Sequence, residues 1–116
     1  MRANDRWLHT DRVLTLVRLE RQSRHARFGQ EDLPDVAQPF ADVDVRDDYK
    51  ALADEWKETN AQRVELETLA WDGVLLEEAF DAVSKSNPHT LKAALIQVAA
   101  GATAWAEAID RRANAS

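Results

Sequence analysis

Residues 91–109 read LKAALIQVAAGATAWAEAI, the stretch with the clearest helical period in the chain. Its apolar side chains recur four and three residues apart, at Leu91, Leu95, Val98, Ala102, Trp105 and Ile109. At ~100° per residue all six share one narrow face of a helix, which predicts a packing surface. The residues between them are mostly alanine and glycine, which let a neighbouring helix approach closely. This stretch therefore indicates an all-α fold.

Three further helices are expected before this one. They cover about residues 10–27, 46–69 and 71–84, and the fourth helix extends to about Arg112. The second helix has one apolar face that includes Tyr49, Leu52, Ala53, Trp56 and Ala70. Four helices in one chain of this length favour a single domain, residues 1–116, folded as a compact four-helix bundle.

Turn-forming residues and capping residues set the expected limits of these helices. Gly29, Pro34 and Pro39 fall close together, so a loop is expected over about residues 28–45. Thr10 is a candidate N-cap for the first helix. Ser86 or Asn87 is expected to cap the fourth helix, because Pro88 suits a first helical position.

Composition excludes several classes of protein. The chain has 116 residues, a net charge of −6 and no cysteine, so it has no disulfide framework, thiolate zinc site or cysteine nucleophile. The acidic surplus argues against general nucleic-acid binding. No segment approaches the ~20 apolar residues of a membrane span, and no secretory leader is visible, so a cytoplasmic protein is expected. A helical domain this small often completes its core by pairing, which predicts a homodimer or homotetramer.

The expected third helix is acidic between two apolar sides. Glu77, Glu78 and Asp81 fall within a sector of about 100° around Val74, so their carboxylates are expected to be partly buried. Like charges three and four residues apart repel by a few tenths of a kcal/mol, and burial increases that cost. A hard divalent cation such as Mg²⁺ would neutralise the cluster. A solvated helix face, or pairing with lysine and arginine elsewhere, is the alternative explanation.

Four stretches resemble the MazG-like nucleotide pyrophosphohydrolases, in particular the small phage and actinobacterial members. Residues 71–82, WDGVLLEEAFDA, look like the family's EExxE element, with Asp81 in place of the last Glu. The stretches LKAALIQVAA (91–100) and WAEAIDRR (105–112) are similar to the helix that follows it. The segment ERQSRHARFGQ (20–30) resembles the arginine-rich start of the same proteins.

The resemblance implies an all-α NTP pyrophosphatase fold that is dimeric or larger. It implies that acidic residues of two adjacent helices hold Mg²⁺ or Mn²⁺ and that a nucleoside triphosphate is hydrolysed to a monophosphate and pyrophosphate. Carried over by position, Glu77 and Glu78 would be catalytic, and both would bind the metal together with Asp81.

The family's second acidic element, ExxD, is missing. It aligns with residues 94–97, where Ala94 has no ligand atom and Gln97 has only a neutral amide. Weak metal binding is therefore expected unless a carboxylate of the second helix, such as Glu55, Glu58 or Glu65, or one of another subunit replaces it. A catalytically inactive relative that binds nucleotides or proteins, and a purely structural helical protein, are the alternatives.

Two further groups are candidates for contact with a nucleotide. Arg18, Arg21, Arg24 and Arg27 recur every third residue, and Arg21 and Arg24 in particular could face a triphosphate; the alternative is a solvated basic face. Trp71 precedes the acidic cluster on the same helix and could stack on a base, whereas Trp56 and Trp105 are expected to pack in the core. Gln97 is the remaining candidate, as a neutral contact to the substrate.

Overall fold

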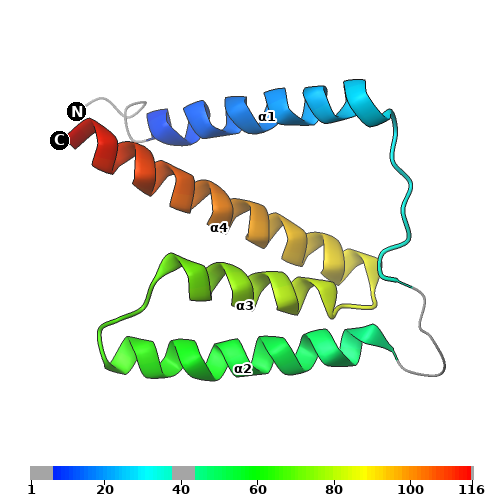
Figure 1. Cartoon of the computed structure of the whole chain (residues 1–116), viewed down its shortest axis with the longest axis vertical. Helices are drawn as coiled ribbons and strands as arrows, with labels where there is room; N and C mark the ends of the chain where they lie inside the picture. The colour runs from blue at the N-terminus through cyan, green and yellow to red at the C-terminus, as the bar shows by residue number, and fades with distance from the viewer. Residues whose placement is uncertain (1–6, 38–43, 116) are drawn as a thin grey trace. The chain divides into compact units, whose positions relative to one another are not determined.

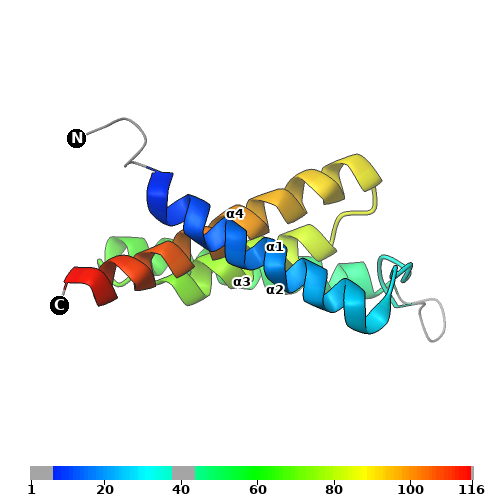
Figure 2. The ribbon, with the colours of Figure 1, turned by 90° about the horizontal axis from the view of Figure 1, so that it is seen from above.

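The computed structural model describes residues 7–37 and 44–115, and within them the chain is all-helical (Figure 1). The elements are α1 (Leu8–Phe28), α2 (Val45–Glu65), α3 (Trp71–Val83) and α4 (Pro88–Ala115). Figure 2 shows the same four helices from above. None of the described helices is both long enough and apolar enough to cross a bilayer.

The chain divides into two compact units, and α4 contributes to both. The α2–α3 unit is Pro34–Gly101, and the terminal unit combines Met1–Leu33 with Ala102–Ser116. Within the α2–α3 unit, α2 and α3 run antiparallel and side by side (Figure 1). The predicted all-α class is confirmed.

The core of the α2–α3 unit is built from small side chains. Ala53 of α2, Ala82 of α3 and Ala94 of α4 are buried, and no large side chain among the described residues is fully buried. Alanine at these positions lets helix backbones approach closely, as the composition of residues 91–109 predicts.

The predicted packing face of α4 is only partly correct. Leu91 and Val98 are half-buried, whereas Leu95 and Ile109 are 47% and 49% exposed. The buried residue is Ala94, which lies about 100° around the helix from Leu95. The buried position of this part of α4 is therefore a small side chain rather than one of the large ones.

The end of α2 also differs from the prediction. The helix stops at Glu65, because Glu67 takes a left-handed conformation with φ 57°. The N–H of Glu67 donates to the Val64 carbonyl, and the N–H of Thr68 donates to the Arg63 carbonyl at 2.8 Å. These two bonds form the Schellman pattern. Ala70 therefore lies outside α2 and immediately precedes α3 instead of extending the apolar face of α2.

The helix starts follow the capping predictions in one case and depart from them in another. Asn87 caps α4, because its Oδ1 accepts hydrogen bonds from the backbone N–H groups of His89 at 2.8 Å and Thr90 at 3.4 Å. Thr10, however, lies inside α1, which begins at Leu8 without a side-chain cap. In α2 the Asp44 side chain accepts from the Arg46 N–H. Of the predicted loop 28–45, Phe28 ends α1 and Val45 begins α2, and residues 38–43 lie outside the described part of the chain.

Candidate functional site

A cavity of about 290 Å³ lies in the α2–α3 unit, and we call it the acid cavity. Three helices line it, through Lys50, Ala53, Asp54 and Lys57 of α2, Glu77, Glu78 and Asp81 of α3, and Gln97 of α4. The three predicted acidic side chains are each partly buried, as expected. The structure thus brings together the predicted metal ligands and Gln97.

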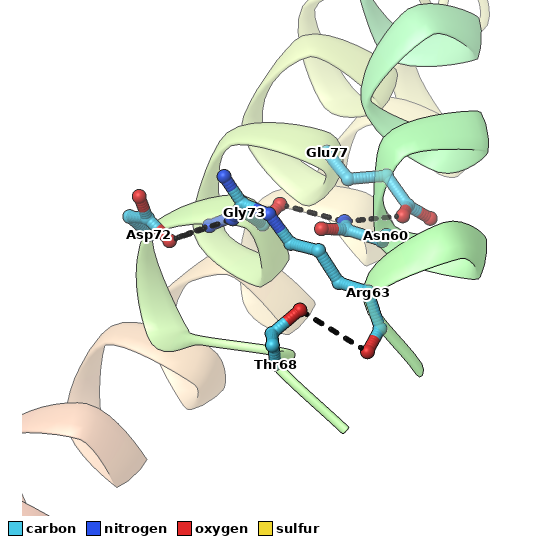
Figure 3. Close-up of polar contacts among 6 residues, drawn as sticks. All are labelled: Asn60, Arg63, Thr68, Asp72, Gly73 and Glu77. Carbon is cyan, nitrogen blue, oxygen red and sulfur yellow. Dashed lines mark hydrogen bonds and ion pairs between the residues drawn. The ribbon is translucent and has the colours of Figure 1, made fainter. Parts of the chain in front are cut away.

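Glu77 is held by a buried amide of the neighbouring helix (Figure 3). Asn60 is only 7% exposed, and its Nδ2 donates to Glu77 Oε1 at 2.8 Å and to the Gly73 carbonyl at 2.9 Å. A Cβ on residue 73 would clash with Asn60 Oδ1, so glycine is required for this approach. Asn60 therefore ties one carboxylate of the acid cavity to the α2–α3 contact.

Arg63 reinforces the same contact one turn further along α2. Its Nη1 donates to Asp72 Oδ1 at 3.1 Å, and its guanidinium lies over the Trp56 ring at 5.5 Å from the centroid. Asp72 Oδ1 also accepts from the Gly73 N–H at 2.7 Å (Figure 3). The start of α3 is thus fixed against α2 close to Glu77.

Glu78 points toward α4 instead. A Cβ on Gly101 would lie 3.1 Å from Glu78 Oε1, so the carboxylate rests directly on the glycine. Burial, with a further contribution from the negative charge of Glu77, raises the pKa of Glu78 above its usual 4.5. Glu78 is therefore a carboxylate whose ionised form the fold disfavours.

Two other acidic side chains of the acid cavity form ion pairs with lysines. Asp81 lies 3.4 Å from Lys85 Nζ, and Asp54 lies 2.6 Å from Lys50 Nζ. The hydrogen bond and charge of Asp54, with a smaller effect of Asp81, raise the pKa of Lys50. Lys57 has no ion-pair partner among the residues that the structure describes. Lys57 therefore differs from Lys50, whose ammonium is paired with Asp54.

The donor types of the acid cavity suit a hard divalent cation, because they are carboxylates and one amide oxygen. Within residues 7–37 and 44–115, however, no three histidine, aspartate or glutamate side chains form a metal-binding group. Asn60 holds Glu77 on one side, while Glu78 lies against Gly101 and Asp81 against Lys85. The three side chains line one space without converging in it.

Other predicted residues lie outside the acid cavity. Ala94 is buried at 7% exposure and does not line it, and Trp71 at the start of α3 does not line it either. None of the α2 carboxylates suggested as replacements contributes, namely Glu55, Glu58 and Glu65; Asp54 takes that place.

Arg21 and Arg24 belong to the terminal unit, where they line a separate cavity of about 480 Å³ with apolar residues of α1. Arg24 is engaged there, because it donates to both carboxylate oxygens of Glu31, at 2.7 and 3.0 Å. Its guanidinium also lies over the Phe28 ring at 5.6 Å.

The cavity residues of α2 were missed in the sequence, although a signal was present. Lys50, Ala53, Asp54 and Lys57 have the i, i+3, i+4, i+7 spacing of one helix face. That face alternates lysine with aspartate and resembles an ordinary solvated surface. Asn60 gave no signal, and Gly101 indicated only that a neighbouring helix could approach, because the importance of both depends on which helices are neighbours.

Comparisons with protein-family models, with curated proteins and with solved structures gave no match for this chain. The resemblance to MazG-like proteins therefore rests on residues 20–30, 71–82, 91–100 and 105–112 alone.

Proposed function

We propose that the acid cavity binds a nucleoside triphosphate together with Mg²⁺ or Mn²⁺, and that the chain is a MazG-like nucleotide pyrophosphohydrolase with a weakened metal site. The observation that carries this proposal is the sharing of one cavity by Glu77, Glu78, Asp81 and Lys57, the last of which forms no ion pair with another described residue. A cluster of partly buried carboxylates beside an ammonium is complementary to a cation bound to phosphate.

Each side chain has a distinct proposed role. Glu77, Glu78 and Asp81 would hold the cation, with Gln97 as a neutral contact to the substrate. A bound divalent cation would offset phosphate charge and polarise a phosphoryl oxygen. Lys57 would pair with a phosphate oxygen. In hydrolysis, water supplies the new P–O bond as the bond between the α and β phosphates breaks. Glu77 or Glu78, whichever is not bound to the cation, would accept the water proton.

A catalytically inactive relative that keeps nucleotide binding is the second candidate. It is favoured by Ala94, which is buried and has no ligand atom, and by the lack of a converged group of three carboxylates among the described side chains. Binding and turnover must therefore be measured separately.

The test is calorimetric titration of nucleoside triphosphates with Mg²⁺ or Mn²⁺, followed by a pyrophosphate-release assay on the same samples. Binding that needs the cation and falls at least tenfold in Glu78→Gln is the expected result. Glu58→Gln is the matched control, because Glu58 is an exposed carboxylate of α2 outside the cavity. Pyrophosphate release that is lost in Glu78→Gln supports the enzyme, whereas binding without release supports the inactive relative. Equal binding by both variants would exclude the acid cavity as the site.

We also propose that the chain forms a homodimer or homotetramer through α1. This is supported by the apolar side chains of α1, of which only Val13 is buried, whereas Leu16 and Leu19 are 60% and 53% exposed. Such a surface is typical of a helix that packs against another copy. Light scattering after size exclusion should give a multiple of the chain mass for the native protein and a lower multiple for Leu16→Glu. Gln22→Glu adds the same charge at an exposed position of α1 and should leave the mass unchanged.

A further inference from the structure

A second hollow of about 300 Å³ adjoins the acid cavity within the α2–α3 unit. It is formed by α2, the α2–α3 connection and α3, through Lys57, Asn60, Ala61, Val64, Leu69, Val74, Glu77 and Glu78. Lys57, Glu77 and Glu78 line both spaces. The two spaces therefore share a border made of one ammonium and two carboxylates.

The outer wall of this hollow is apolar, in contrast to the acid cavity. Ala61, Val64, Leu69 and Val74 supply it, and both Val64 and Leu69 are largely exposed to solvent. Exposed apolar area costs about 25 cal/mol per Å², so a ligand that covers this wall gains affinity. A hollow of this size with apolar walls and a polar border has the character of a small-molecule subsite.

Hydrogen bonds hold the segments that carry this wall. The Schellman turn at Glu67 and Thr68 sets the path of the α2–α3 connection that carries Leu69. The Asn60 bonds to Gly73 and Glu77 hold α3, which carries Val74. A wall that is ordered before binding loses little conformational entropy when a ligand packs on it.

We infer that this hollow is a nucleoside subsite, which receives the base of a nucleotide whose phosphates lie in the acid cavity. The inference rests on the proposed function and adds where the base lies. Lys57 stands at the border, where a phosphate chain would pass from one space to the other. Apart from Lys57, Asn60, Glu77 and Glu78 the lining residues are apolar, so most of the contact offered to the base is apolar. Discrimination among bases is therefore expected to follow apolar area, with a purine bound more tightly than a pyrimidine.

The test compares ATP, CTP and inorganic tripolyphosphate, each with Mg²⁺, by calorimetry. Ala61→Phe fills the hollow from an exposed position of α2, and Val64→Asp places a charge on its wall at another exposed position. Gln62→Phe is the matched control, because it adds the same ring at the next residue, outside the hollow.

ATP should bind the native chain at least tenfold more tightly than tripolyphosphate, with CTP between them. Ala61→Phe and Val64→Asp should reduce ATP affinity to that of tripolyphosphate and leave tripolyphosphate binding unchanged, while Gln62→Phe changes neither. Unchanged ATP affinity in both hollow variants would overturn the subsite but not the proposed function. Failure of all three ligands to bind the native chain would overturn both.

Discussion

Glu77 on α3 accepts a hydrogen bond from the buried amide of Asn60 on α2, with 2.8 Å between Oε1 and Nδ2. The same Nδ2 donates to the Gly73 carbonyl one turn earlier on α3. One side chain thus joins the helix contact to the acid cavity, and a change at Asn60 should affect both.

Asn60→Leu should lower the free energy of unfolding by about 1–3 kcal/mol, because a buried hydrogen bond to a carboxylate is lost. Urea denaturation monitored by circular dichroism measures this. Gln62→Leu is the control at an exposed position of the same helix and should change stability by less than ~0.5 kcal/mol. Equal stabilities of the two variants would show that the Asn60 bonds contribute nothing net.

Gly73→Ala should also destabilise the chain, by about 1–3 kcal/mol, through overpacking rather than bond loss. The new Cβ meets the Asn60 side chain, so the cost should largely disappear when Asn60 is replaced by alanine as well. A double-mutant cycle in urea measures this coupling. Additive effects would show that the two residues do not meet as described.

Glu78→Gln should raise the melting temperature at neutral pH. The raised pKa of Glu78 means that the folded state binds its proton more tightly than the unfolded state. The ionised carboxylate therefore destabilises the fold above the folded-state pKa, and this penalty disappears below the ordinary value of 4.5, where both states are protonated. The gain from Glu78→Gln should accordingly shrink as the pH is lowered toward 4. A gain that is independent of pH would assign the effect to something other than ionisation.

Gly101→Ala should weaken nucleotide binding without lowering stability. Alanine in a helix is more stable than glycine by up to about 1 kcal/mol, but its Cβ would push on the Glu78 carboxylate. Thermal denaturation should therefore show equal or higher stability, while Mg²⁺-dependent nucleotide affinity falls several-fold. Ala100→Gly is the reverse change at an exposed neighbour and should lower stability with affinity unchanged. Native affinity in Gly101→Ala would show that the position of Glu78 is unimportant.

Gln97→Asp should strengthen Mg²⁺ binding several-fold, because it adds a carboxylate where Gln97 already lines the acid cavity. Gln97→Asn introduces a side chain of the same size as aspartate but without its charge, and it should not strengthen Mg²⁺ binding. Ala94→Glu is expected to destabilise the chain instead, because that position is buried and a charge there is poorly solvated. Titration of each variant with Mg²⁺ and ATP distinguishes these outcomes.

The sequence alone was enough to predict the four helices and the α3 side chains that line the acid cavity. Periodicity predicted four helices, and the spacing of Glu77, Glu78 and Asp81 predicted that they are partly buried on one side of α3, because both depend on positions within one helix. The end of α2 was missed because Glu67 adopts a conformation that favours glycine, so no residue type signalled the turn.

The rest of the site depends on which helices meet, and one helix considered alone contains no such information. Lys50, Asp54 and Lys57 face the acids only because α2 packs beside α3. The buried face of α4 was misjudged for the same reason, because Ala94 is buried while the larger Leu95 stays exposed.

The alanine core of the α2–α3 unit has a practical consequence. Ala53, Ala82 and Ala94 each remove little apolar area from water, so side-chain burial at these positions contributes only modestly to holding the native state. A compound at 100 times its dissociation constant adds about 2.7 kcal/mol by mass action, a large increment against such a background. The melting curve of this small protein should therefore be a sensitive detector of its own physiological ligand, and a library of metabolites could be surveyed without labels or assumptions about turnover.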